Sequence, residues 1–218
     1  MPQRIVSELQ ALASETRRKH PEVRQAADAA LRELQRDPDA ALAASRAQAD
    51  AAPEGGVLLQ PVLLACATKT PKVVLLAVAL LHRCVLLHAV PDSALPRVVE
   101  ALQSLTASPS RTDIDAQLRI LQTVSALITG YTGITAQLLS STLMVCFALY
   151  EHSRVAVVSS TAAATLRQSI MVVFDKVNDE DHALESIQGG GEAAALTAPL
   201  PVHTAKTPDG HVTLFPCC

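Results

Sequence analysis

The interior of this protein has to be built almost without aromatic side chains. The 218 residues include three Phe, two Tyr and no Trp, although 49% of them are hydrophobic. Ala, Leu and Val must therefore fill the core, and Ala and Leu are among the strongest helix formers. A chain of this length buries roughly 70% of the surface that its unfolded form exposes, so it can form a core without metals or disulfides. The composition favours an all-α fold.

Proline, rather than glycine, marks the expected helix boundaries in the central part of the chain. No glycine lies between Val57 and Thr129, whereas five prolines do. Proline is tolerated in the first turn of a helix, because the N–H groups there have no partner within the helix. We therefore expect these prolines mainly at helix starts, most clearly at Pro71, where Thr70 can act as N-cap. Gly130 can end a later helix in the left-handed conformation.

The spacing of apolar residues predicts about eight helices, stacked as an armadillo-like α-solenoid. In the first helix, Ile5, Leu9 and Leu12 lie at positions i, i+4 and i+7. Several later helices are apolar on nearly all sides, which is typical of helices packed between two neighbours in a stack of hairpins. The Ala-rich segment from Asp37 to Gly56 predicts a partly helical loop that contributes little to the core. The helices expected after the first cover residues 21–35, 59–68, 72–88, 92–106, 113–129, 136–150 and 160–177.

The most apolar stretch of the central part indicates a buried helix. Residues 73–90 begin with nine uninterrupted apolar residues and continue with His and Arg. Because a membrane span needs about 20 apolar residues, a helix in the core is the better interpretation. We expect Leu76, Leu80 and, on the last helix, Phe174 to be inaccessible to solvent.

The pattern of the chain changes after Val177. The sequence becomes acidic, three consecutive glycines follow at 189–191, and the remaining residues show little periodicity. Such a composition is typical of linkers. We therefore expect one helical domain over residues 1–185 and a linker or disordered tail over residues 186–218.

Composition and motifs argue against several classes of function. The net charge of −3 provides no general field for nucleic acid, and few aromatic residues are available for stacking on bases. The chain has no phosphate-binding loop, no dinucleotide fingerprint, no zinc-protease motif and no nucleophile elbow. Cys84 and His88 are spaced four residues apart but have no second ligand pair, so we expect no metal and no cofactor. The sequence predicts a protein that is not an enzyme.

Two short features are candidates for membrane contact. Arg17, Arg18 and Lys19 follow the first helix, where cations complement the helix dipole or attract anionic headgroups. The terminal Cys217 and Cys218 resemble a double-cysteine end that accepts two prenyl chains, although the preferred interpretation is that a fragment stops there. Three cations alone are marginal for stable anchoring.

Several separated motifs carry a resemblance to a known family. The first is LQALASETRRKHPEVRQAAD at 9–28, the second is LLQPVLLACATKTPKVVLLAVALLHRCV at 58–85, and the third is TAAATLRQSIMVVFDKV at 161–177, supported by LRILQTVSAL at 118–127. Together they resemble the N-terminal dimerisation and cyclophilin-binding (DCB) domain of the large late-Golgi Arf exchange factors. Within that group the chain is more similar to the non-catalytic Golgi-transport scaffold of the monensin-sensitivity type. The resemblance covers roughly residues 5–177.

The resemblance implies a regulatory and scaffolding module on the cytoplasmic face of the trans-Golgi network and endosomes. Its implied partners are an Arf-like small GTPase, a second copy in a homodimer, and downstream domains of a parent scaffold. Membrane association would be peripheral and indirect. A purely structural dimerisation domain and a lipid-anchored membrane adaptor are the alternatives.

Seven residues in the resembling motifs are candidates for partner binding. Each also has a structural interpretation: capping and solvation for the first three, bonding to the preceding helical turn for the next two, and hydrogen bonds within the domain for the last two. The candidates are Lys69, Thr70, Lys72, Thr161, Thr165, Arg167 and Gln168.

Deleting residues 189–218 should leave thermal unfolding unchanged, because a segment without apolar periodicity has little to bury. Circular dichroism of the full and shortened chains would measure both melting midpoints. A large loss of stability in the shortened chain would mean that the tail docks on the helices.

Overall fold

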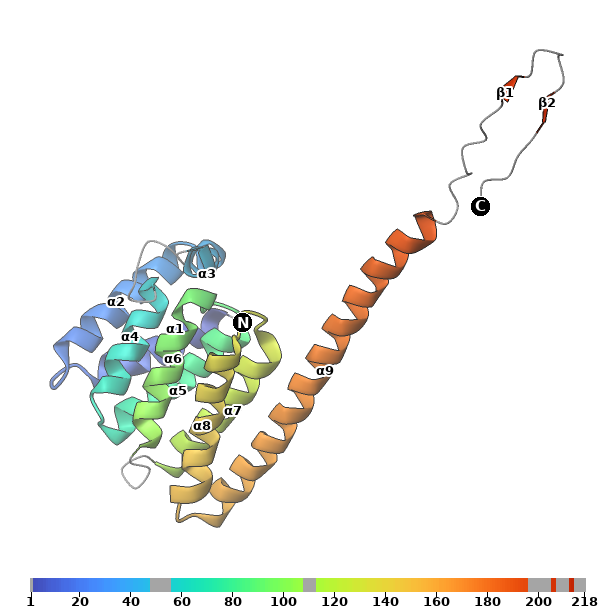
Figure 1. The fold of residues 1–218 in the computed structure, drawn as a ribbon. Helices are drawn as coiled ribbons and strands as arrows, with labels where there is room; N and C mark the ends of the chain where they lie inside the picture. Colours follow the sequence, from blue (N-terminus) through green and yellow to red (C-terminus); the bar gives the residue numbers. More distant parts are fainter. Residues whose placement is uncertain (1, 48–55, 108–112, 196–204, 207–211, 214–218) are drawn as a thin grey trace. The chain divides into compact units, whose positions relative to one another are not determined.

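The computed structural model describes residues 2–47, 56–107, 113–195, 205–206 and 212–213. The chain divides into two compact units, Met1–Val173 and Phe174–Cys218. The described residues form nine α-helices, and the expected all-α class is confirmed (Figure 1). Their bounds are α1 Pro2–Glu15, α2 Pro21–Arg36, α3 Pro38–Ala47, α4 Gly56–Ala67, α5 Pro71–Leu86, α6 Leu95–Thr106, α7 Ile114–Gly130, α8 Ala136–His152 and α9 Ala156–Ala195.

Shorter elements complete the described part of the chain. A 3₁₀ turn, η1 (Asp92–Ala94), leads into α6, so the helix expected over 92–106 has a tighter first turn. In the second unit, β1 (Ala205–Lys206) pairs antiparallel with β2 (Val212–Thr213). These strands fall within the expected tail, most of which lies outside the described residues.

Helix α5 lies at the centre of the first unit. It packs against α1, α4 and α7, and the other helices extend the stack on either side, with α2 on α1 and α4, and α8 on α6 and α7. The buried residues of α5 share one broad face, about half of the helix circumference: Val73, Val74, Ala77, Val78, Leu80, Leu81, Cys84 and Val85. The expected buried helix is therefore confirmed.

Of the three residues expected to be inaccessible to solvent, only Leu80 is fully buried. The side chain of Leu80 is 0% exposed, whereas Leu76 is only partly buried. The expectation for Phe174 was wrong, because 70% of this residue is exposed. Helix α9 buries Val158, Ala162 and Leu166 in the core of the first unit, whereas Phe174 is the first residue of the second unit.

The Ala-rich segment after Asp37 contributes more to the fold than expected. Ten of its residues form α3, and the side chains of Leu42 and Ser45 are buried. The Ser45 hydroxyl donates to the Ala89 carbonyl at 2.6 Å, and the Arg46 guanidinium donates to the carbonyls of Leu87 and His88 at 2.8 and 2.9 Å. Helix α3 thus satisfies carbonyl groups at the C-terminus of α5, which a helix end leaves without partners.

Two expectations about helix boundaries were wrong. Pro61 lies in the interior of α4 and not in its first turn, because this helix already begins at Gly56. Gly130 ends α7 without a left-handed conformation; among the described glycines only Gly56 has a positive φ. A Cβ at Gly130 would lie 3.2 Å from the His88 ring, so this glycine provides space for His88.

Replacing Leu80 by Ala should lower the free energy of unfolding by about 2–5 kcal/mol, because a fully buried side chain leaves a cavity. Phe174→Ala is the matched comparison: its side chain is mostly exposed, so we expect a change within about 0.5 kcal/mol. Urea denaturation of both variants would measure the difference. Equal destabilisation would contradict the assignment of Leu80 to the core and of Phe174 to the surface.

Candidate interaction sites

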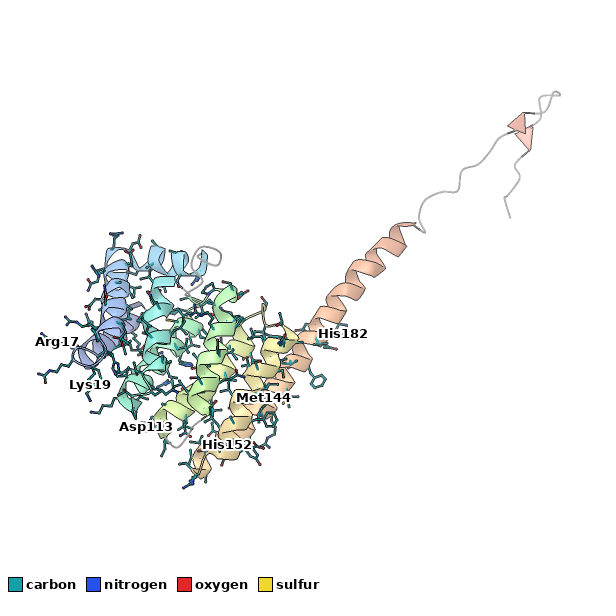
Figure 2. All side chains as sticks on the ribbon, turned by 60° about the vertical axis from the view of Figure 1, so that its left-hand side comes forward. Arg17, Lys19, Asp113, Met144, His152 and His182 are labelled. Atoms are coloured by element: carbon teal, nitrogen blue, oxygen red, sulfur yellow. The ribbon has the colours of Figure 1, made fainter. Side chains whose placement is uncertain are left out.

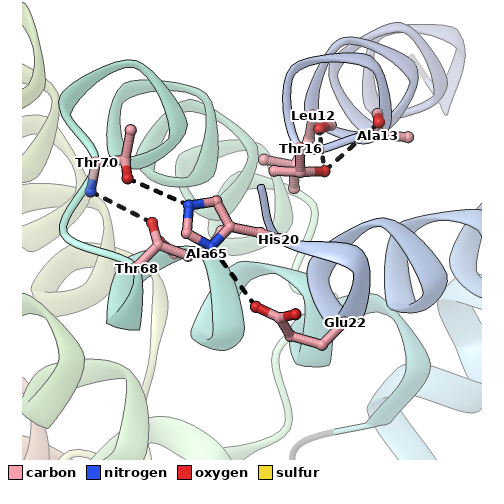
Figure 3. Close-up of polar contacts among 8 residues, drawn as sticks. All are labelled: Leu12, Ala13, Thr16, His20, Glu22, Ala65, Thr68 and Thr70. Atoms are coloured by element: carbon pink, nitrogen blue, oxygen red, sulfur yellow. Dashed lines mark hydrogen bonds and ion pairs between the residues drawn. The ribbon is translucent and has the colours of Figure 1, made fainter. Parts of the chain in front are cut away.

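Two helix connections meet at one end of the first unit. The turn between α1 and α2 contains Thr16 to His20, and the turn between α4 and α5 contains Thr68 to Thr70. The His20 Nε2 atom lies 3.3 Å from the Thr70 hydroxyl, and the His20 Nδ1 atom lies 3.6 Å from a carboxylate oxygen of Glu22 (Figure 3). His20 therefore joins two turns that are fifty residues apart in the sequence.

This contact changes the role expected for Thr70. The residue is the N-cap of α5 and precedes Pro71 at the helix start, as expected, but its hydroxyl makes no capping hydrogen bond. The hydroxyl instead faces His20, and the Thr70 backbone N–H donates to the Thr68 hydroxyl at 3.4 Å (Figure 3). A side chain placed by sequence as a local cap thus holds a tertiary contact.

Five exposed cations surround the paired turns, and we call them the basic end. Arg17 and Lys19 extend into solvent at one edge of the unit (Figure 2). None of the five takes part in an ion pair within the described part of the chain. The sequence places them in two groups, one expected near membranes and one expected at a partner, whereas the fold places both groups beside the same contact. The basic end comprises Arg17, Arg18, Lys19, Lys69 and Lys72.

Lys69 owes its position to an uncommon backbone conformation. Its φ of 54° lies in the left-handed region, where the chain leaves α4 and turns into α5. Its backbone N–H bonds to the Cys66 carbonyl at 3.4 Å. Non-glycine residues seldom adopt this conformation, and no signal in the sequence indicated it.

A groove opens between α5, α7 and α9 near the C-terminus of α5. Its volume is about 560 Å³. Val85, Leu86 and Leu121 supply apolar surface, and Leu86 is 50% exposed there. The polar residues that line it are His82, His88, Gln122, Ser125, Thr129, Thr161 and Thr165. The groove therefore combines apolar surface with hydroxyl, amide and imidazole groups.

The candidates on α9 divide into two pairs. Thr161 and Thr165 line the groove, and their hydroxyls donate to the carbonyls of Val157 and Thr161 at 2.7 and 2.9 Å, as expected of threonines that bond to the preceding turn. Arg167 and Gln168 are exposed and do not line the groove. The Arg167 Nε donates to the Ala163 carbonyl of its own helix at 3.3 Å. The fold thus separates two pairs that lie in one motif.

His82 is the titratable group whose pKa this groove shifts most clearly. Burial lowers its pKa, and the charges of Arg119 and Arg83 lower it further, so the imidazole is neutral at pH 7. Its Nδ1 atom is buried without a hydrogen-bond partner. His88, at the same end, lies against Tyr131 with ring centroids 5.3 Å apart. The sequence gives no sign that His82 and His88 line a groove, since only the packing of α5 against α7 forms it.

The buried cysteine thiols are unsuited to act as nucleophiles or metal ligands. Burial raises the pKa of Cys66, Cys84 and Cys146 to about 12, so these thiols stay protonated at neutral pH. Within the described ranges, no group of three or more His, Cys, Asp or Glu side chains is placed to hold a metal ion. The arrangement suits recognition of a partner through grooves and charges.

One helical segment among the described residues is long and apolar enough to cross a membrane by length and composition. It covers Ala156–Asp179 of α9. The same segment buries Val158, Ala162 and Leu166 in the core of the first unit, so part of its apolar character serves packing. In the sequence, residues 73–90 are the more obvious candidate for a membrane span, because their apolar run is more continuous.

Comparison with known proteins identifies relatives over most of the chain. Residues 1–181 match the family described as Mon2/Sec7/BIG1-like, dimerisation and cyclophilin-binding domain. Protein MON2 homolog of Homo sapiens is 30% identical over 80% of this chain, and Protein MON2 of Saccharomyces cerevisiae is 27% identical over 83%. Brefeldin A-inhibited guanine nucleotide-exchange protein 1 of Rattus norvegicus is 26% identical over 72%. The chain spans about a tenth of the length of each of these relatives.

The basic end should give weak, salt-sensitive attraction to anionic vesicles. The Debye length, the distance over which exposed charges act, falls from about 30 Å at 0.01 M salt to about 8 Å at 0.15 M. Vesicle flotation should therefore recover the protein with the vesicles at the lower salt and leave most of it unbound at the higher salt. Charge reversal at Arg18 and Lys69 should abolish the low-salt binding, and neutral vesicles serve as the control. Tight binding that resists salt would show that other groups insert into the bilayer.

Proposed function

Because the chain belongs to the family of Mon2/Sec7/BIG1-like dimerisation and cyclophilin-binding domains, we propose that it is a non-catalytic scaffolding module that binds an Arf-like small GTPase in its GTP-bound form. In this proposal the chain acts in membrane trafficking, which its similarity to proteins named MON2 supports, and self-association is the property for which the family is named. Recognition of a GTP-bound GTPase is the more specific part of this proposal.

The observation that carries this proposal is the groove between α5, α7 and α9. GTP orders the switch segments of small GTPases, so a partner that reads the nucleotide must recognise the ordered surface. A groove with exposed Leu86, apolar neighbours and a polar lining matches the usual composition of such contacts, an apolar centre within a polar rim. Thr161 and Thr165, which the family resemblance singles out, lie in its wall.

The basic end would have a supporting role in this proposal. Exposed cations orient a protein towards anionic membranes and acidic surfaces without fixing a specific contact. The GTPase would supply the firm attachment to the cytoplasmic face of the trans-Golgi network and endosomes. Homodimer formation and the downstream domains of the parent scaffold would then place several GTPase sites on one assembly.

The groove also separates this function from the alternatives. A purely structural dimerisation domain needs no GTPase contact, and a lipid-anchored adaptor would use Cys217 and Cys218, which lie outside the described residues. Neither alternative requires an exposed Leu86 in a polar-lined groove. A change confined to the groove therefore tests GTPase binding without altering the other two functions.

Leu86→Glu should weaken binding of GTP-loaded Arf-like GTPases at least tenfold, because its carboxylate would lose its hydrating water against an apolar partner, which is costly. Isothermal calorimetry with GTP-locked and GDP-loaded members of the Arf and Arf-like families would measure it. We expect micromolar affinity for the GTP form and much weaker affinity for the GDP form.

Ile114→Glu provides the matched control. Ile114 is 44% exposed, close to the 50% of Leu86, but it lies at the start of α7 and does not line the groove. This variant should bind as the unaltered chain does. Equal affinity for both nucleotide states would remove nucleotide sensing from the proposal, and absence of binding to every GTPase tested would leave self-association as the function.

A further inference from the structure

Helices α8 and α9 expose large hydrophobic residues at positions where a soluble helix usually carries polar groups. Of the ten large hydrophobic residues that are exposed in the described part of the chain, eight lie on α8 and α9. Helix α8 carries Met144, Phe147 and Tyr150, which include two of the five aromatic residues of the whole sequence. Met, Phe and Tyr are enriched at protein interfaces. This choice of residues points to a protein partner for α8.

The three side chains form one stripe. They are spaced at i, i+3 and i+6, so they follow one face of the helix over two turns. Another face of α8 is already used, since Val145, Cys146 and Leu149 are buried in the core that α8 shares with α6 and α7. We call Met144, Phe147 and Tyr150 the α8 stripe. It lies at a distance from the basic end, as the positions of Met144, Arg17 and Lys19 in Figure 2 show.

The charge pattern of α8 restricts the kind of partner. Its first fifteen residues, Ala136 to Tyr150, include no charged residue. A partner that brings its own charges would leave them unpaired at the contact, which is costly. An anionic membrane would be better served by surrounding Lys and Arg residues, which this part of α8 lacks. An uncharged apolar surface is the complementary partner.

A second copy of the chain provides such a surface. We propose that the α8 stripe is the face through which two copies associate, with α8 antiparallel to its counterpart across a two-fold axis at Phe147. Met144 and Tyr150 lie three residues before and after Phe147, so this symmetry places each Met144 opposite the Tyr150 of the partner. Contacts between Met sulfur and aromatic rings are favourable.

This inference rests on the self-association included in the proposed function and names its surface. Stable interfaces bury roughly 1,200–2,000 Å² in total, and two helical stripes reach at most the lower end of that range. We therefore expect a dimer that dissociates at micromolar concentrations. The groove is not part of the stripe, so each copy would remain free to bind a GTPase.

Sedimentation velocity of the complete chain over about 1–100 μM tests the proposal, a range that brackets micromolar dissociation. The unaltered chain should shift from monomer to dimer. Phe147→Glu should remain monomeric throughout, because two carboxylates would meet at the axis. Leu86→Glu, which changes an equally exposed apolar residue in the groove, should dimerise normally. Thermal unfolding of Phe147→Glu should match that of the unaltered chain, since its side chain is 46% exposed.

A second variant tests the geometry directly. Phe147→Cys should form a disulfide between two copies under mild oxidation, because the axis brings these positions together. Leu86→Cys is the control, and mass spectrometry of the linked peptide distinguishes the introduced thiol from the native cysteines. No dimer of the unaltered chain, or a dimer that Phe147→Glu leaves intact, would overturn the proposal. GTPase binding by Phe147→Glu, measured in parallel, separates this failure from a failure of the groove.

Discussion

The burial of one broad face of α5 is the constraint on which the rest of the first unit depends. A helix that buries about half of its circumference has to be covered by several neighbours, and α1, α4 and α7 do this. Its interior residues are Val, Leu, Ala and Cys, so the surrounding helices meet small side chains along the whole length. The Arg83 Nε atom, 3.4 Å from a carboxylate oxygen of Glu8, links α5 to α1 at the edge of this apolar contact. The stack therefore grows outward from one helix.

The two ends of α5 lead to different surfaces. At the N-terminus, the Thr70 contact with His20 brings together the turns that carry the basic end. At the C-terminus, α3 covers the free carbonyls, and His82, Leu86 and His88 open into the groove. Sixteen helical residues separate the two ends by about 24 Å. One buried helix thus fixes the spacing between the surface proposed for membrane attraction and the surface proposed for the GTPase.

The absence of aromatic residues from most of the core has a consequence for the surface. A core packed from Ala, Leu and Val is complete without Phe147 and Tyr150, which remain on the outside of α8. Large exposed side chains in an uncharged helix segment cost solubility unless a partner covers them. The composition that allows close helix packing inside the unit therefore leaves Phe147 and Tyr150 for contacts with other molecules.

Periodicity, proline positions and composition by themselves determined the all-α class and the buried helix at 73–90, because these properties depend on local spacing. The resemblance to the DCB family rested on separated sequence motifs, two of which lie within single helices. The tertiary structure decided how far along α9 the buried stretch extends, and therefore why Phe174 is exposed. It also decided that Thr70 contacts His20, that two basic clusters share one end, and that Thr161 and His82 line the same groove. These features depend on which turns and helices become neighbours, and spacing within one helix carries no information about that choice.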